Sequence, residues 1–531
     1  MTQTTSIPFA KTGYFSKTIC DYLEQKTFIQ DFYTNFPDLK GFEIQIKSRI
    51  KFNNTLDRKT LVQTLRSQYQ KLDTSLKTQE NIESLLSENT FTVTTGHQLN
   101  LFTGPLYFLY KIISTINLTA QLKREFPTYN FVPVYWMATE DHDFEEIQYF
   151  NFQGNKIIWK KETEGAVGRI DTNGLQDVFD ELSKQLGNSN HAIAIKELFK
   201  KSYLEHDTLS AATHYLANEL FGQQGLVILD ADKKALKKSF IFHIKNELIN
   251  QTCHKEVSKT IGELEKNYKI QVKPREINLF YMDKNLRERI IFENGKFKVN
   301  NTDILFSEKE ILKEVDANPE KFSPNVLMRP LYQEVILPNL CYIGGGGELA
   351  YWLELKNYFN SLKVSYPILL LRNSALLITK KQGKKMQKLG ISKEDIFQKQ
   401  TALLKYKIKD ISEINIDFSP QRKQLEKMFQ DLEALANQTD RSFLGAVKAQ
   451  EKKQINGFDK LEKRLLKAQK RKLSDIVERI TILQNELFPN YSLQERNANF
   501  SEFYLHHGKQ LNDILFRSLQ PLNQQFDLIE I

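Results

Sequence analysis

The sequence predicts an α/β protein in which a doubly wound parallel sheet precedes a long α-helical coiled coil. Two observations carry this prediction. Between residues 90 and 375, short apolar runs that end in polar residues alternate with segments of helical periodicity. From residue 419 onward, glycine becomes scarce, and apolar residues recur at steps of three and four positions.

Residues 1–88 are polar with helical spacing, so we expect a mostly helical segment that packs on the core. Five apolar or β-branched runs are expected to form the sheet, namely 91–95, 131–136, 225–230, 339–343 and 366–371.

A helical apolar stretch, which begins near Pro105, joins the first two of these runs. Strand, helix and strand in this order are typical of a parallel βαβ crossover, which places the polar loops after both strands at one edge of the sheet. Ligands of open α/β sheets bind at that edge. We therefore expect the loops around His97 and His142 to face one pocket.

The other segments complete the expected domain organisation. The core spans 89–390, and the turn and hairpin character of 150–210 and 265–330 predicts that these segments are insertions. A coiled-coil arm is expected over 391–489, and the C-terminal segment 490–531 has enough apolar positions to return to the core.

Two apolar seams predict the helices of the arm. They consist of Leu425, Met428, Leu432 and Leu435, and of Leu473, Ile476, Ile480, Leu483 and Leu487. The hairpin turn is expected at 438–442, with Asn456-Gly457 as the alternative. A helix of about 45 residues would extend about 68 Å. Such an arm should pair with a second copy, so we expect a homodimer.

Composition indicates a folded globular protein, with 40% hydrophobic and 26% charged residues among 531. No apolar run approaches the roughly 20 residues of a membrane helix, and no leader pattern opens the sequence, so we expect a cytoplasmic protein without membrane contact. The net charge of +9 suits anionic substrates or nucleic acid. We interpret the basic stretch 448–472 as a solvated helix face and do not expect nucleic acid as a partner.

Polar residues after the expected strands are the candidate site. The glycines 344–347 permit unusual backbone angles and a close approach of N–H groups to an anion, although a purely structural turn is the alternative. Arg329 and Arg372 are suited to bind a carboxylate or phosphate, or else to form salt bridges.

The cluster Glu140-Asp141-His142-Asp143 is suited to acid/base chemistry or to a divalent metal, but no further metal ligands can be identified. Asp143 is also suited to cap a helix, with Glu146 completing a capping box. The two interpretations are compatible.

Several long motifs, in order along nearly the whole chain, resemble the bacillithiol biosynthesis cysteine-adding enzyme family. The motifs are 95–98 (TGHQ), 102–107 (FTGPLY), 140–146 (EDHDFEE), 322–330 (FSPNVLMRP), 342–352 (YIGGGGELAYW) and 372–374 (RNS). The resemblance implies a cysteine ligase that joins L-cysteine to glucosaminyl-malate in the last step of bacillithiol biosynthesis. It also implies a Rossmann-like core similar to nucleotidylyltransferases and class I aminoacyl-tRNA synthetases, with a dimerising coiled coil.

The resemblance implies the following site. His142, Asp141 and Asp143 are the expected catalytic residues. The expected substrate-binding residues are Thr95, Gly96, Gln98, Thr103, Gly104, Tyr107, Glu140, Arg329, Gly344, Gly345, Gly346, Gly347, Glu348, Tyr351, Trp352, Arg372, Asn373 and Ser374. No metal ligand is assigned.

Amide formation in water requires an activated carboxyl group, so ATP is the expected cosubstrate, with magnesium as its companion ion. N–H groups at the Gly104-Pro105 helix start and at the glycines are expected to stabilise phosphate or oxyanion charge. Arg329 or Arg372 would hold the malate carboxylates. His142 or a neighbouring carboxylate would accept the proton of the attacking ammonium. The alternative is an RNA-associated or nucleotidyl-transferring protein with a synthetase-like core and a basic coiled coil.

Overall fold

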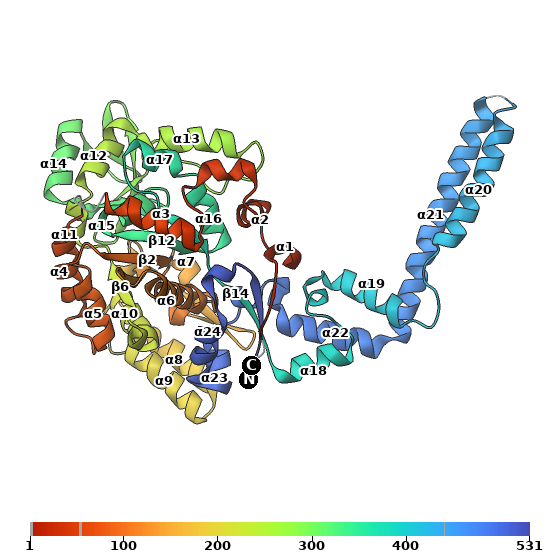
Figure 1. Ribbon diagram of the computed structural model, residues 1–531, viewed down its shortest axis with the longest axis horizontal. Helices are drawn as coiled ribbons and strands as arrows, with labels where there is room; N and C mark the ends of the chain where they lie inside the picture. The colour runs from red at the N-terminus through yellow and green to blue at the C-terminus, as the bar shows by residue number, and fades with distance from the viewer. Residues whose placement is uncertain (1–3, 52–55, 440) are drawn as a thin grey trace.

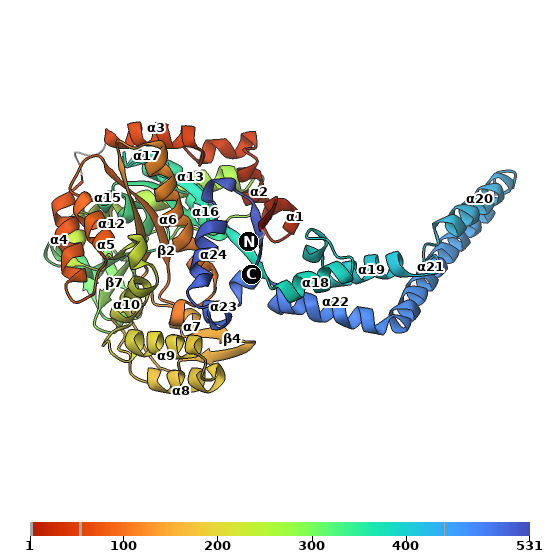
Figure 2. The same cartoon turned by 60° about the horizontal axis from the view of Figure 1, so that its bottom comes forward.

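The computed structural model describes residues 4–51, 56–439 and 441–531. It consists of a compact α/β body and a helical arm that projects from it, as two views show (Figures 1 and 2). Among the described helices, none combines the length and the apolar character that crossing a membrane requires.

The centre of the body is a five-stranded sheet in the order β13-β12-β2-β3-β6, and every neighbouring pair in it is parallel. Its strands are β2 (Thr90–His97), β3 (Asn130–Met137), β6 (Val227–Asp230), β12 (Asn339–Gly344) and β13 (Ile368–Leu371). The expected strands and the doubly wound, Rossmann-like sheet are therefore confirmed. The winding proceeds from β2 through β3 to β6, and then returns to the other side of β2.

Helix α6 (Tyr107–Glu125) makes the crossover between β2 and β3 and packs against both strands. It is buried on almost every side, which explains why its apolar residues are not confined to one stripe. Lys111, within this buried stretch, is only 3% exposed.

The two longest connections of the sheet form separate layers. Between β3 and β6 lie α7 (Phe144–Ile147), the hairpin of β4 (Tyr149–Phe152) and β5 (Asn155–Ile158), and then α8 (Leu175–Leu186), α9 (Asn190–Tyr203) and α10 (Leu209–Phe221). Between β6 and β12 lie α11 (Lys234–Lys238), α12 (Ile241–Asn250), α13 (Thr252–Leu264), α14 (Glu308–Ala317) and α15 (Arg329–Ile336). The same connection carries an antiparallel sheet of β7 (Leu279–Asp283), β8 (Leu286–Glu293), β9 (Lys296–Val299), β10 (Leu305–Phe306) and β11 (Phe322–Pro324).

The two ends of the chain meet beside the body (Figure 1). Strands β1 (Thr4–Ile7), β15 (Phe526–Glu530) and β14 (Ser374–Ile378) form one small sheet with β15 in the middle. The N-terminal helices are α1 (Phe9–Thr12), α2 (Lys17–Leu23), α3 (Leu39–Ile50), α4 (Arg58–Tyr69) and α5 (Leu76–Ser84). The remaining helices of the body are α16 (Gly346–Leu353), α17 (Lys356–Ser361), α23 (Phe500–His507) and α24 (Gln510–Ser518).

The arm is a hairpin of α20 (Ser419–Ala436) and α21 (Arg441–Lys472), which pack together along their length. Its turn lies between these helices, as the prediction of a turn at 438–442 requires, although Asp440 is outside the described residues. The alternative turn is wrong, because Asn456 and Gly457 lie within α21.

A single long helix after the turn was also expected, and this is wrong. The helix is interrupted at Leu473, whose ψ of 31° is not helical, and the chain continues as helix α22 (Ser474–Leu487). Helix α21 alone, with 32 residues, extends about 48 Å. Helices α18 (Lys380–Lys388), α19 (Gln400–Ile411) and α22 connect the arm to the body (Figure 2).

The second expected seam does not face a partner copy. Ile480, Leu483 and Leu487 are fully buried in the core of the chain itself, where α22 packs against α19 and β14. In the arm, Phe429 and Ala436 pack against Val447 of the opposite helix. The first expected seam is therefore not the contact between the two arm helices. Its residues Met428, Leu432 and Leu435 are 63%, 41% and 57% exposed.

Candidate functional site

A cavity of about 420 Å³ opens at the carboxyl edge of the parallel sheet. Each of the five strands contributes to its wall just after the strand ends, through Gln98, Glu140, Ala231, Gly345 and Arg372 in turn. This is the edge at which open α/β sheets bind ligands. The volume is within the usual range of small-molecule sites.

The loops after β2 and β3 are joined directly, as the βαβ argument predicts. The side-chain amide of Gln98 donates to Asp141 over 3.0 Å and to Glu146 over 2.9 Å. Burial alone would raise the pKa of Asp141, but hydrogen bonds from His142 and Gln98 hold it well below its ordinary value. Asp141 is thus a fixed negative charge on the wall of the cavity.

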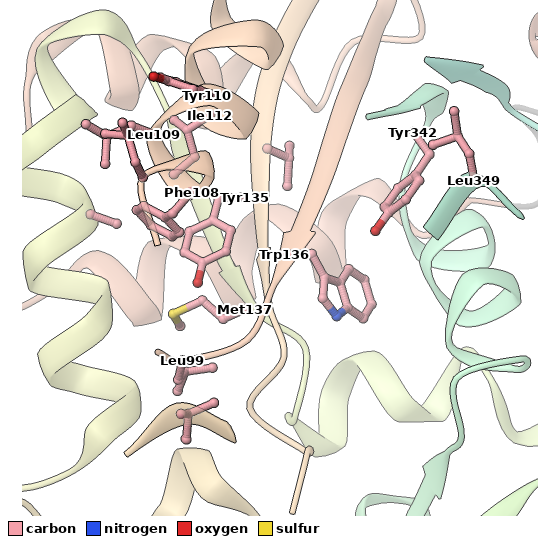
Figure 3. Packing of buried hydrophobic residues seen from close by; sticks show 14 of the residues in the cluster. Leu99, Phe108, Leu109, Tyr110, Ile112, Tyr135, Trp136, Met137, Tyr342 and Leu349 are labelled. Carbon is pink, nitrogen blue, oxygen red and sulfur yellow. The ribbon is translucent and has the colours of Figure 1, made fainter. Parts of the chain in front are cut away.

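Arg329, the first residue of α15, lies between two aromatic rings. Its guanidinium carbon is 5.7 Å from the centre of the Trp136 ring and 5.4 Å from that of Tyr342. Figure 3 shows these rings on strands β3 and β12, on either side of the space at the end of β2. The β2 residue between them is Gly96, where an added Cβ would lie 3.2 Å from the Tyr342 hydroxyl. A glycine at this position leaves room for the Tyr342 hydroxyl, while the guanidinium would lie 3.8 Å from the added Cβ, at ordinary contact distance.

Arg329 retains binding capacity toward the cavity. Its Nη1 donates to Gln333 over 3.0 Å. Its Nη2 is buried and makes no hydrogen bond of normal geometry among the described residues, although the Tyr351 hydroxyl lies close to the guanidinium. Because a buried unpaired donor is costly, this nitrogen is poised for an anion.

Arg372 forms the salt bridge that the sequence allowed and also lies on the cavity wall. The salt bridge is buried and joins Arg372 to Glu495 over 2.7 Å. Its Nη1 donates to the Asn373 carbonyl and the Ser374 hydroxyl. Its Nε has no partner in the part of the chain that the structure describes, and the guanidinium lies 4.9 Å from the Tyr107 ring centre.

Three of the four glycines, Gly345 to Gly347, line the cavity, but none of the four has the positive φ that the sequence argument anticipated. Close packing explains why residue 344 is a glycine, because an added Cβ would lie 3.0 Å from each of three neighbouring side-chain atoms. The Gly345 N–H donates to the Glu348 carboxylate over 2.8 Å, so this N–H group is not available to bind an anion.

Lys111 is a site residue that sequence reasoning missed. Its ammonium lies 2.6 Å from a Glu348 carboxylate oxygen and donates to the Gly96 carbonyl over 2.7 Å. It thereby ties the end of β2 to the first turn of α16. Burial lowers the pKa of Lys111, whereas Glu348 opposes that shift. A single lysine inside an apolar helix was the only signal that the sequence offered.

Arg287 and Arg496 also line the cavity and were not anticipated. Arg287 comes from β8 in the long connection, and its guanidinium lies 3.9 Å from the Phe280 ring centre. Arg496 lies in the C-terminal segment, next to Glu495. Together with Lys111, Arg329 and Arg372, they give the lining more cationic side chains than carboxylates, which are Glu140, Asp141 and Glu348.

His142 faces outward from the cavity rim. It is half exposed and lines a wider hollow on the outer surface, together with Asp143. Its Nδ1 is 2.7 Å from Nη1 of Arg287. Because an arginine only donates, this Nδ1 accepts in a neutral ring, whose proton is then on the other nitrogen. The hydrogen bond from His142 to Asp141 is in that case the one from the backbone N–H, over 2.8 Å.

The acidic residues around His142 each have a different structural partner. Asp143 caps α7 by accepting the Glu146 N–H over 3.2 Å, as predicted. The expected capping box is absent, because the Glu146 carboxylate accepts from Gln98 instead. Glu140 forms a salt bridge of 2.8 Å with the fully buried Lys237.

Several expected binding residues lie outside the cavity lining. They are Thr95, Thr103, Gly104, Gly344, Trp352, Asn373 and Ser374. The expected anion site at the start of α6 is wrong, since the Gly104 N–H donates to Leu101 and the Leu106 N–H donates to Ala498. The returning C-terminal segment thus covers this helix start.

Within the described residues, no group of three His, Cys, Asp or Glu side chains gathers as a metal site. The expected magnesium ion therefore has no preformed set of protein ligands among the described residues.

Comparisons with known proteins agree over the whole chain. Residues 2–373 match the model of the bacillithiol biosynthesis BshC N-terminal Rossmann-like domain, and residues 375–531 match the BshC C-terminal coiled-coil domain. A relative from Flavobacterium johnsoniae is 57% identical and covers 99% of this chain and 100% of its own. Relatives from Flavobacterium psychrophilum and Christiangramia forsetii are 58% and 54% identical, and each match covers 99% of both chains.

All three relatives carry the name "Putative cysteine ligase BshC". Each match extends from the parallel sheet through the arm, so the matched region includes the loops that line the cavity. The chain belongs to the BshC family of bacillithiol biosynthesis.

Proposed function

We propose that this protein joins the carboxyl group of L-cysteine to the amine of glucosaminyl-malate, which completes bacillithiol. The names of its relatives support the cysteine ligase activity. The observation that carries the proposal is the unpaired Nη2 of Arg329, buried in a cavity that Arg372 also lines. Two guanidinium groups in one cavity suit the two carboxylates of malate.

Activation of the cysteine carboxyl group is the energetic requirement of this reaction. We propose ATP as the cosubstrate: a carboxylate oxygen attacks a phosphorus atom of ATP and displaces pyrophosphate or ADP. The amine then attacks the carboxyl carbon, and AMP or phosphate leaves from it. The nitrogen loses a proton as the amide forms. The cationic lining supports this, because it would stabilise the negative charge of the phosphates. Magnesium would enter bound to these phosphates.

Asp141 and His142 are the proposed groups for the amine. The low pKa of Asp141 makes it a poor base but a good partner for an ammonium group. His142 accepts a proton only after Arg287 releases its Nδ1. We propose that an anionic substrate draws Arg287 away, which frees His142 as the base. A cytoplasmic location would supply both ATP and cysteine.

A homodimer formed through the arm is also proposed. Its support is the exposed apolar row of Met428, Leu432 and Leu435 on α20, which the hairpin partner does not cover. Exposed apolar rows on soluble proteins commonly mark interfaces.

The activity can be tested with purified protein supplied with glucosaminyl-malate, L-cysteine and ATP. Mass spectrometry should find bacillithiol, together with a nucleotide product, only when all three are present. In cells, deletion should abolish bacillithiol and accumulate glucosaminyl-malate. Unchanged bacillithiol in the deletion strain would contradict the proposal.

A further inference from the structure

Arg329 is connected to the sheet by a chain of buried side chains. Its Nη1 donates to the Gln333 oxygen over 3.0 Å, one turn later on α15. The Gln333 amide nitrogen donates to Glu334 over 2.9 Å. Gln333 and Glu334 are 0% and 1% exposed, so water does not compete for these bonds.

The far end of the chain is anchored in the two central strands. Asn339, the first residue of β12, donates to the same Glu334 oxygen over 2.7 Å. The Asn339 oxygen in turn accepts hydrogen bonds from Thr92 and Thr94 of β2. Each amide in the chain therefore has its oxygen and nitrogen assigned by its neighbours.

The aromatic rings beside Arg329 leave its orientation incompletely defined. Stacking against Trp136 and Tyr342 favours a position for the guanidinium, but rings provide no directional acceptor. The bond to Gln333 selects which nitrogen faces the protein, and so which nitrogen is left for a ligand. Holding a long side chain in one orientation beforehand lowers the entropic cost of binding.

We propose that Gln333 is a positioning residue that presents Arg329 Nη2 to a carboxylate of the malate group, with Glu334 and Asn339 holding Gln333 in place. The identification of malate rests on the proposed function. The contribution of Gln333 to anion binding does not depend on any turnover.

The test compares Gln333→Met, Arg329→Met and wild type by calorimetric titration with L-malate and with glucosaminyl-malate. Methionine keeps the length and buried volume of Gln333 but removes both hydrogen bonds. The control is Ile336→Val, a small packing change at a buried position on the same helix. Gln333→Met should weaken binding of both ligands by about tenfold, and Arg329→Met by more.

Steady-state kinetics separate positioning from general damage. For Gln333→Met, KM for glucosaminyl-malate should rise about tenfold, while KM for cysteine and kcat stay within about twofold. Ile336→Val should bind as wild type does. Wild-type affinity in Gln333→Met, or no binding of either ligand to wild type, would overturn the proposal. So would an equal loss in Ile336→Val, because packing alone would then explain it.

The outcome is separable from that of the proposed activity. If the purified protein makes no bacillithiol but binds malate in a manner that requires Gln333, the ligase assignment fails and the positioning role stands. If product forms and Gln333→Met retains the wild-type affinity, the positioning role fails alone.

Discussion

Gln98 donates its side-chain amide to Asp141 over 3.0 Å, which joins the loop after β2 to the loop after β3. The same nitrogen donates to Glu146 over 2.9 Å. One neutral side chain thus separates two carboxylates that would otherwise repel each other. This arrangement keeps Asp141 ionised at the wall of the cavity.

Replacing Gln98 by Glu should lower the rate of product formation about tenfold, because a third carboxylate removes both hydrogen bonds and repels Asp141 and Glu146, which breaks the link between the two loops. Initial rates measured from pH 6 to pH 9 would show this. Gln98→Met, which removes the amide without adding charge, is the control and should lose less activity. Wild-type rates in Gln98→Glu would show that the link between the two loops is unimportant for the reaction.

His142→Ala should lower the rate of ligation by about 10²- to 10⁴-fold, the usual effect of removing a general base. The variant should keep its melting temperature, since His142 is half exposed at the rim. His142→Asn separates the possible roles, because asparagine hydrogen-bonds but does not titrate. If bacillithiol levels in cells with His142→Asn equal those of wild type, His142 is not the base.

Gly345→Val should abolish product formation while changing the melting temperature little. An added Cβ at Gly345 has ordinary contacts of 3.5 and 3.7 Å, so folding tolerates it, but the branched side chain narrows the cavity. Gly344→Val is the contrasting variant. Its Cβ would meet neighbours at 3.0 Å, and thermal unfolding should shift downward. Loss of stability in both variants alike would indicate a structural turn without a binding role.

We expect the dimer interface at the exposed apolar row of α20, which consists of Met428, Leu432 and Leu435. Replacing Met428, Leu432 and Leu435 together by Asp should give monomers in light scattering with the melting temperature of the body unchanged. The corresponding change at Ile480 and Leu483 should instead destabilise the chain, because both residues are fully buried within it. A triple arm variant that keeps the dimer mass would exclude this row as the interface.

Stability should depend on pH through Glu334. Burial raises its pKa from 4.5 to about 7, so the folded state binds a proton that the unfolded state releases between these values. Stability contributed by the protonated form is therefore present below about pH 4.5 and is lost as pH rises to about 7. Glu334→Gln removes this titration and keeps an oxygen for Gln333 and Asn339. Its gain in melting temperature over wild type should be larger at pH 8 than at pH 5; an equal difference at both values would contradict the assignment.

The gathering of polar loops at one edge of the sheet could be predicted from the sequence because it depends on local pattern. Apolar runs of four to eight residues specify the five strands, and parallel crossovers bring their carboxyl ends to one side. That argument placed Gln98, Glu140, Gly345 and Arg372 around one cavity before any contact was known. The hairpin turn near 438–442 followed from local composition in the same way.

Other features depended on partners that are remote in the sequence. Lys111 is identified as a site residue only by its contacts with Gly96 and Glu348, the latter 237 positions away. Ile480 and Leu483 have the spacing of a coiled-coil seam, but the body of the chain buries them first.

The sequence by itself determined the sheet, the crossovers and the polar character of the strand ends, since strand periodicity and connection length are properties of neighbouring residues. Tertiary structure alone decided which guanidinium nitrogen of Arg329 is left without a hydrogen bond of normal geometry. It also decided that Arg287 donates to Nδ1 of His142, and that the Ala498 carbonyl accepts the Leu106 N–H at the start of α6. Hydrogen bonds between distant side chains form only when packing brings donor and acceptor within about 3 Å, and no local pattern records that approach.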